Sequence, residues 1–379
     1  MAKYRFDQIA INCKEKAKAD SIDISTYIGL EHLDSGSLIV SRWGSAVPIK
    51  GDKILMHKGD VLFGKRNAYL RRAAIAPHDG AFSAHGMIFR AREDVIDKSF
   101  FPLFIASDYF FDTAIRISVG SLSPTVNWRD LKDQEFELPD MDTQRKLAEV
   151  LWSINDTMEA YKRLISATDE LVKSQFMEQF GSYLGDETRC ATVEQVCTVF
   201  ADGDWIESKD QADDGIRLIQ TGNVGNGVYL DKGERARYID EETFVRLNCT
   251  EVLPNDILIS RLPDPVGRAC IIPDGLGKSI TAVDCSIVRL KSHVLPEFFV
   301  AYTMTTLYAA QIGSSVTGST RKRISRKNLG QVVIPTPDID QQEQFAAFVR
   351  QSDKSKFELE QALSELTATY KRIITENLG

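Results

Sequence analysis

Apolar residues between positions 142 and 180 recur in alternating steps of four and three. The residues that follow this spacing are Leu147, Leu151, Ile154, Met158, Tyr161, Ile165 and Val172. Such spacing places an apolar stripe along one helix and is typical of a helix that pairs with another. Asp142 stands where a residue could cap its start, and Gly181 stands where a glycine could end it. At ~1.5 Å per residue, the pattern predicts a helix roughly 55–60 Å long.

The C-terminal segment repeats this pattern at an offset of 198 residues. Leu147 then corresponds to Phe345, and Leu151 corresponds to Val349. The segments that lead into the two helices also correspond, and the second has Glu343 three residues after Asp340, the spacing of a capping box. The sequence therefore predicts an internal duplication whose two long helices pair with each other.

The segments before each long helix are related in the same way. Short apolar runs bounded by turn residues predict strands, and residues 58–65 and 72–77 correspond to residues 254–261 and 268–273. The offset increases from 187 near Phe6 to 198 at Gly120, which indicates insertions in the loops of the second copy. Residues 100–117 have helical spacing and an aromatic face, which we interpret as core rather than as a platform for stacked bases. This arrangement predicts two divergent globular domains and two matching helices.

The charge is unevenly distributed along the 379 residues. The net charge is −8, but residues 140–180 and 338–379 each carry eight acidic and five basic side chains, so the predicted long helices hold −6 of it. The remaining residues are nearly neutral and include dense basic clusters. An acidic total therefore does not exclude nucleic acid as a partner, because the acidic helices can lie away from it.

Motifs for catalysis, cofactors and metals are missing from the sequence. No Pro-Pro pair exists for the base-holding motif of an adenine methyltransferase, and Gly277-Lys278-Ser279 lacks the earlier glycine of a phosphate-binding loop. The Pro-Asp pairs are not followed by the Asp/Glu-x-Lys of a magnesium-dependent nuclease, and the five histidines lack metal-ligand spacing. We expect no catalytic residue, no metal and no cofactor.

The sequence also favours a cytoplasmic location. The six cysteines form no C-x-x-C pair and are expected to be reduced. No apolar run reaches the length of a membrane span, and the first residues do not form a secretory signal.

Three basic stretches are the candidate binding residues. Residues 317–327 are the densest, and residues 65–72 and 260–268 occupy equivalent positions of the two copies. Cations of this kind can neutralise phosphates or contact guanine, although each stretch could also be a solvated loop. The candidate DNA contacts are Lys65, Arg66, Arg71, Arg72, Arg261, Arg268, Ser319, Thr320, Arg321, Lys322 and Arg323. Contacts to phosphate are expected to outnumber contacts to bases.

Together, the duplicated order of motifs resembles the DNA-specificity subunit of type I restriction–modification systems. The resemblance rests on the repeat, on Gly318-Ser319-Thr320 followed by Ile324, and on Pro335-x-Pro337 before Gln341-Gln342. The first copy departs from it, since Leu122 follows Gly120-Ser121. It implies an α/β (α+β) fold with two target-recognition domains related by pseudo-two-fold symmetry and separated by two long antiparallel coiled-coil helices. The expected division is 1–140 for the first domain, 141–181 for the central helix, 182–337 for the second domain and 338–379 for the C-terminal helix.

The resemblance further implies a non-catalytic subunit that binds double-stranded DNA. Each domain would recognise one half of a bipartite target, and the helices would set the spacer and bind two modification (methyltransferase) subunits. Restriction subunits, which are ATP-dependent endonucleases and translocases, would join the complex. The alternatives are a specificity subunit of another restriction class with a fused nuclease–methyltransferase partner, a nuclease or methyltransferase acting alone, and a coiled-coil scaffold without a DNA role.

Overall fold

The computed structural model describes residues 1–18, 22–263, 265–318 and 321–378. The chain forms two compact units. Unit 1 comprises Met1–Lys162 together with Gln361–Gly379, and unit 2 comprises Arg163–Glu360. Both units combine short strands with helices, which confirms the predicted α/β fold class.

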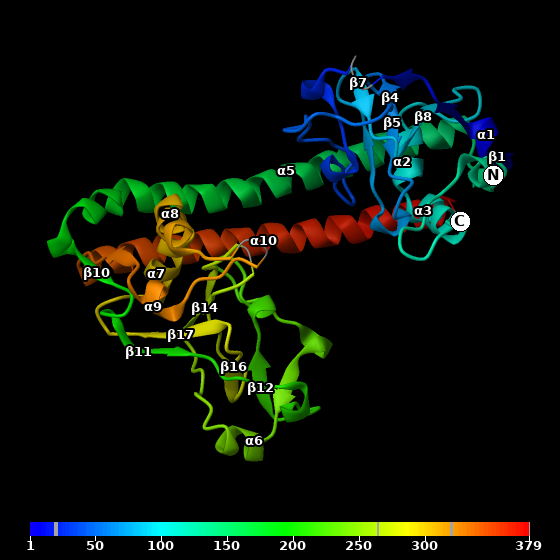
Figure 1. The fold of residues 1–379 in the computed structure, drawn as a ribbon. Helices are drawn as coiled ribbons and strands as arrows, with labels where there is room; N and C mark the ends of the chain where they lie inside the picture. The colour runs from blue at the N-terminus through cyan, green and yellow to red at the C-terminus, as the bar shows by residue number, and fades with distance from the viewer. Residues whose placement is uncertain (19–21, 264, 319–320, 379) are drawn as a thin grey trace. The chain divides into compact units, whose positions relative to one another are not determined.

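Two helices of 40 residues each, α5 (Met141–Phe180) and α10 (Ile339–Leu378), contribute to both units (Figure 1). In unit 1, the hydroxyl of Thr367 in α10 lies 3.9 Å from the sulfur of Met158 in α5. Earlier in α5, Leu151 belongs to the same core cluster as Ile374, which lies later in α10. The two helices are therefore antiparallel within unit 1.

The same pairing occurs in unit 2 between the other halves of these helices. Asp169 of α5 and Lys356 of α10 form an ion pair of 2.7 Å. Further along α5, the ring of Phe180 packs edge-on against Phe345, near the start of α10, with 5.6 Å between centroids. Late residues of α5 thus meet early residues of α10, which confirms the predicted antiparallel pair.

The caps at the helix starts differ from the sequence prediction. The side chain of Asp140 accepts a hydrogen bond of 2.9 Å from the Thr143 amide, so Asp140, not Asp142, caps α5. In α10, Asp340 lies inside the first turn and does not precede the helix. Both helices begin within four residues of the end of the preceding strand, and this leaves the second aspartate of each lead-in within the first turn. The end of α5 at Phe180, just before Gly181, agrees with the prediction.

Unit 1 is built on a four-stranded antiparallel sheet in the order β2-β8-β5-β6. Its strands are β2 (Ala10–Cys13), β5 (Val61–Phe63), β6 (Ala73–Ile75) and β8 (Met87–Ala91). The other strands of the unit are β1 (Ala2–Arg5), β3 (Lys16–Ala17), β4 (Lys53–Met56), β7 (Gly80–Phe82) and β9 (Glu135–Leu138). Its short helices are α1 (Phe6–Ile9), α2 (Phe101–Ala106), α3 (Asp108–Arg116) and α4 (Trp128–Leu131).

Unit 2 repeats this sheet with the order β11-β17-β14-β15. Its strands are β11 (Cys197–Asp202), β14 (Ile257–Ser260), β15 (Ala269–Ile271) and β17 (Cys285–Leu290). The others are β10 (Cys190–Thr192), β12 (Ile216–Ile219), β13 (Arg237–Ile239), β16 (Ser279–Thr281) and β18 (Val333–Pro335). The short helices are α6 (Glu241–Arg246), α7 (Pro296–Thr303), α8 (Thr306–Ser315) and α9 (Arg326–Gly330).

The two units diverge in their three-stranded sheets. Unit 1 has the antiparallel order β3-β4-β7, whereas unit 2 has β13-β12-β16 with β12 and β16 parallel. Strand β13 and helix α6 lie between residues 219 and 254, where the sequence offset between the copies increases. The segment in which the offset increases thus differs between the units, while the order of the four-stranded sheet is the same in both.

A buried ion pair recurs at the same place in each unit. The guanidinium of Arg90 in β8 lies 2.5 Å from Asp60, just before β5, and Arg289 in β17 lies 2.8 Å from Asp256, just before β14. Each aspartate also accepts a hydrogen bond of 2.8 Å from the backbone amide three residues upstream. The donor to Asp60 is His57, and the donor to Asp256 is Leu253. Because both carboxylates are almost fully buried, this repeated network is strong physical evidence of the duplication.

A buried glutamine joins each long helix to its own unit. The Gln144 amide accepts from the backbone of Asp97 and donates to the carbonyls of Val95 and Pro139. In unit 2, Gln342 makes the same three contacts with Leu295, His293 and Pro337. These glutamines fix the first turn of each helix against the globular part of the unit.

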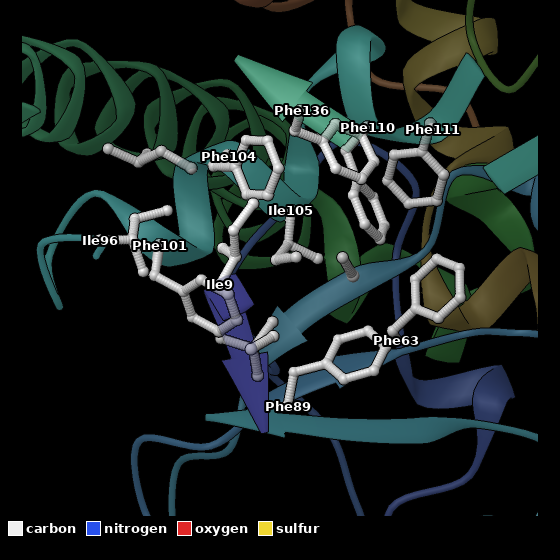
Figure 2. Close-up of a cluster of buried hydrophobic side chains, with 14 of the residues drawn as sticks. Ile9, Phe63, Phe89, Ile96, Phe101, Phe104, Ile105, Phe110, Phe111 and Phe136 are labelled. Atoms are coloured by element: carbon white, nitrogen blue, oxygen red, sulfur yellow. The ribbon is translucent and has the colours of Figure 1, made fainter. Parts of the chain in front are cut away.

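The aromatic segment of unit 1 is core, as predicted. Figure 2 shows Phe101, Phe104, Phe110 and Phe111 directed into one cluster with Phe136, and all five are at most 2% exposed. The segment is two helices, not one, because the Ser107 hydroxyl accepts from the Phe110 amide and caps α3. A base-stacking role for this face is excluded by its burial.

Candidate nucleic-acid interface

The predicted basic stretches lie beside the two Gly-Ser loops and are joined to them in the same way. The Val126 amide donates to the Lys65 carbonyl over 2.9 Å in unit 1, and the Ile324 amide donates to the Arg261 carbonyl over 3.2 Å in unit 2. Lys65 and Arg261 follow equivalent strands, β5 and β14. Each unit therefore presents one composite surface made of a basic stretch and a Gly-Ser loop.

Both Gly-Ser loops are closed by a reciprocal pair of backbone hydrogen bonds. Val119 and Thr125 exchange bonds of 3.1 and 3.0 Å, and Thr317 and Arg323 exchange two of 2.9 Å. In the second loop, Gly318 has a φ of +94° and a Cβ there would lie 2.5 Å from the Arg321 carbonyl. A side chain at this position would be strained and would clash, so the tight turn requires glycine.

The cations of unit 1 have different environments. Arg66 is exposed, and its guanidinium donates to the Ser123 hydroxyl over 3.1 Å, which ties it to the Gly-Ser loop. Arg71 is held by ion pairs of 2.6 Å with Asp108 and Asp112. Lys65 and Arg72 are half-buried. Arg66 is thus the cation of this group that is most open to a ligand.

The backbone around Tyr69 is unusual. Asn67 and Arg71 both have left-handed φ angles, +56° and +48°, and they flank a single 3₁₀ turn that leaves Tyr69 half exposed. Such conformations cost energy at residues other than glycine and concentrate at functional sites. The turn therefore adds Tyr69 to the candidate surface of unit 1.

The two arginines of residues 260–268 are engaged inside unit 2. Arg261 is 5% exposed, donates to the Val283 carbonyl and lies 3.3 Å from Asp202. Arg268 donates to the carbonyl of Val224 over 3.1 Å. These contacts hold neighbouring loops together and leave little of either guanidinium available to an outside ligand.

The densest basic stretch is exposed where the structure describes it. Arg321, Lys322 and Arg323 are all on the surface, immediately before the buried Ile324. Ser319 and Thr320, which the sequence also predicts as DNA contacts, lie outside the described residues. Among the predicted DNA-contact cations of unit 2, the exposed ones thus lie in its Gly-Ser loop.

Sequence reasoning missed two features of unit 1. Leu122, at the tip of the first Gly-Ser loop, is 95% exposed, which is unusual for a leucine. Lys14, Lys16 and Lys53 line a cavity together with Lys65. The alternation of Lys14, Glu15 and Lys16 after a strand would have indicated a basic face, but the contribution of Lys53 depends on the fold.

Within the residues that the structure describes, no group of three or more histidine, cysteine, aspartate or glutamate side chains could hold a metal ion. Over the same residues, none of the helices combines the length and the apolar character that crossing a membrane requires.

Residues 188–367 match the model of a family described as "Type I restriction modification DNA specificity domain". No curated protein matches the chain. A solved structure from a study of the assembly and conformational transition of the type I R-M system aligns over 99% of this chain and 97% of its own, with 18% identity and a TM-score of 0.55. The type I restriction–modification S subunit from M. genitalium aligns over 100% and 96%, with 12% identity and a TM-score of 0.55. At these identities, the two structures support the fold alone.

The matched family is one whose domains are described as giving type I restriction–modification systems their DNA specificity. Residues 188–367 of the chain are thus similar to a type I DNA-specificity domain. The family match covers residues of unit 2 and of the C-terminal helix, and unit 1 repeats the same sheet, ion pair and glutamine contacts. The description of the matched family names DNA specificity and no catalytic activity.

Proposed function

We propose that the chain recognises a bipartite double-stranded DNA sequence, with one half-site for each globular domain. The proposed domains are residues 1–140 and 182–337, and the proposed spacer elements are the helical segments 141–181 and 338–379. A pair of helices about 60 Å long is sufficient to hold two recognition surfaces about 34–36 Å apart, the distance between successive sites on one face of B-DNA.

The observation that carries this proposal is the repeated interface. In each unit, a Gly-Ser loop is bonded to the residue that follows the same strand of the four-stranded sheet. A duplicated scaffold with different loop lengths and different charges suits recognition of two different half-sites. A scaffold without a DNA role would not require exposed cations at the composite surface of each copy, Arg66 in unit 1 and Arg321 to Arg323 in unit 2.

The proposed DNA contacts divide by exposure. Arg66, Arg321, Lys322 and Arg323 are the cations most open to DNA, and Lys65 and Arg72 are at the edge of the same surfaces. Arg71, Arg261 and Arg268 are proposed to position the loops, because internal partners already hold their guanidinium groups. Ser319 and Thr320 remain predicted contacts.

The proposal includes protein partners and a location. Two modification subunits would bind the long helices, and restriction subunits would join that complex. The likeness of the fold to a structure from a study of type I R-M complex assembly supports partners of this kind. A cytoplasmic location is part of the proposal, because the DNA target and these partners would be found there.

Selection from a randomised duplex pool tests the proposal. The chain, in complex with its modification subunits, is incubated with the pool, and the retained duplexes are sequenced. We expect two short motifs separated by a constant number of unspecified base pairs. A single contiguous motif, or no enrichment, would refute recognition by two domains. The genes beside this one distinguish the type I arrangement from a fused nuclease–methyltransferase partner.

A further inference from the structure

Unit 1 contains an open cavity of about 380 Å³, lined by several lysines, at the edge of its candidate interface. It is formed by the end of β2, the start of β4, the second residue after β5 and the segments before β8 and α4. The charged side chains that line it are Lys14, Lys16, Lys53, Lys65 and Asp52. Four cations and one anion give the lining a formal charge of +3.

The single carboxylate does not neutralise these lysines. Asp52 lies 4.0 Å from the Lys16 ammonium, the limit of an ion pair, and both side chains are largely exposed. Lys53 donates instead to the carbonyls of Lys50 and Gly51, over 2.5 and 2.9 Å. Among the residues that the structure describes, no carboxylate pairs with Lys14 or Lys65. Burial lowers the pKa of Lys65, because the charged ammonium loses solvation that no neighbouring anion replaces.

Unit 2 shows how the same position can be neutralised internally. Cys13 pairs with Ile88 across β2 and β8, and Ala201 pairs with Ile287 across β11 and β17. In this register, the residue after Cys13, which is Lys14, corresponds to Asp202. Lys65 corresponds to Arg261, since the carbonyl of each accepts from the amide of the residue that directly follows the Gly-Ser loop.

The two units therefore differ in the sign of one charge. Asp202 lies 3.3 Å from Arg261 and 3.3 Å from Arg326, so unit 2 holds an internal salt bridge at this place. In unit 1 the residues that correspond to Asp202 and Arg261 are Lys14 and Lys65. A cavity lies between the segments that carry these two lysines. Like charges held beside a cavity favour binding of an anion from outside.

We propose that this cavity binds a phosphodiester group of the DNA backbone, so that unit 1 has a phosphate site that unit 2 lacks. The site deepens the proposed function and rests on it. Its position supports a DNA phosphate as the anion, because Lys65 adjoins Arg66 and its carbonyl is bonded to Val126, which follows the Gly-Ser loop. Lys14 and Lys65 would bind the phosphate oxygens, and Lys16 and Lys53 would add attraction at longer range.

The test replaces Lys14 by aspartate, the residue that unit 2 has at the corresponding position, Asp202. Binding of the full chain to a fluorescent duplex from the selected pool is measured by anisotropy between 50 and 200 mM salt. One lost phosphate contact makes the slope of log K against log salt less steep by about 0.9. From 50 to 200 mM salt, wild type should therefore lose about 3.5-fold more affinity than Lys14→Asp. If no motif is recovered, the unselected pool serves as the duplex.

Three variants make the result specific. Lys14→Arg keeps the charge and should restore the wild-type slope. Lys98→Asp makes the same charge change at an exposed lysine of unit 1 outside the cavity lining, and should retain the wild-type slope. Lys14→Gln replaces Lys14→Asp if circular dichroism shows that the latter is unfolded. Lys14 and Lys98 both lie outside the buried core, so none of these variants alters a core residue.

The outcomes separate this proposal from the proposed function. A steep salt dependence of wild type with an unchanged slope for Lys14→Asp would overturn the cavity site and leave the DNA function standing. Absence of salt-dependent binding by wild type would overturn the function itself. Calorimetric titration with pyrophosphate tests whether the ligand is a free anion. If Lys14→Asp abolishes pyrophosphate binding but leaves the salt slope of DNA binding unchanged, a phosphate of the DNA backbone is refuted as the ligand.

Discussion

Substituting Gln342 by alanine should strongly destabilise unit 2. The side chain is fully buried at the start of α10 and makes three hydrogen bonds. Its carbonyl oxygen accepts from the Leu295 amide over 3.0 Å, and its amide nitrogen donates to the carbonyls of His293 and Pro337 over 2.9 and 2.8 Å. Alanine removes all three bonds and leaves three backbone groups without a partner.

The expected loss follows from these contacts. A net contribution of about 0.5–1.5 kcal/mol for each hydrogen bond gives about 1.5–4.5 kcal/mol in total. Backbone groups left unpaired and away from water shift the value upward, whereas water entering the space would shift it downward. We expect the free energy of unfolding to fall by about 3 kcal/mol, which is large compared with ordinary surface substitutions of about 0.5 kcal/mol.

Urea unfolding followed by circular dichroism measures this loss, and hydrogen exchange of peptides that contain Leu295 locates it. The Leu295 amide should lose protection in Gln342→Ala. Gln361→Ala is the matched control, because this glutamine is exposed and its one side-chain hydrogen bond, to Glu365, stays on the helix surface. A change below about 0.5 kcal/mol for Gln342→Ala, with Leu295 still protected, would refute the reasoning.

Further predictions concern the DNA contacts, the thiols and the helices. Replacing both Arg321 and Arg323 by alanine should reduce the salt slope of DNA binding by about two in anisotropy titrations; an unchanged slope would remove them from the interface. Burial raises the pKa of Cys270 to about 12 and of Cys285 to about 11, so neither should react with iodoacetamide in the native state at pH 8, while both should react in urea. Because these thiol pKa values are raised on folding, they contribute stability that is fully present below about pH 9 and is lost as the pH rises through 11–12. Measuring the free energy of unfolding across the alkaline range should detect this loss. Inserting four residues at the same level of α5 and α10 should lengthen the DNA spacer by about two base pairs and leave both half-sites unchanged.

Periodic features of this protein could be predicted from the sequence. The stripe from Leu147 to Val172 defines a helix and its pairing, because burial of one face imposes the same spacing over many residues. The repeat also predicted equivalent strands such as β5 and β14. The cap of α5 was missed by two residues, since Asp140 and Asp142 are chemically equal in the sequence and only the end of β9 decides between them.

The environment of individual cations could not be predicted in the same way. Arg66 and Arg261 are equally basic in the sequence, yet the first is exposed and the second is buried beside Asp202. Asp202 lies 59 positions before Arg261, so their ion pair depends on the register of β11 against β17. The cavity of unit 1 was missed for the same reason, because its lysines come from three separate segments.

The composition of the two units has a consequence for the order of folding during synthesis. Unit 2 is one continuous stretch, and its core needs no residue beyond Glu360. The core cluster of unit 1 includes Ile374 and Leu378, which lie in the last turns of α10. The part of the protein that leaves the ribosome first therefore completes its core last, and until then the early half of α5 exposes an apolar stripe. Removal of a few C-terminal residues should consequently damage the N-terminal unit more than the unit to which they are adjacent in sequence.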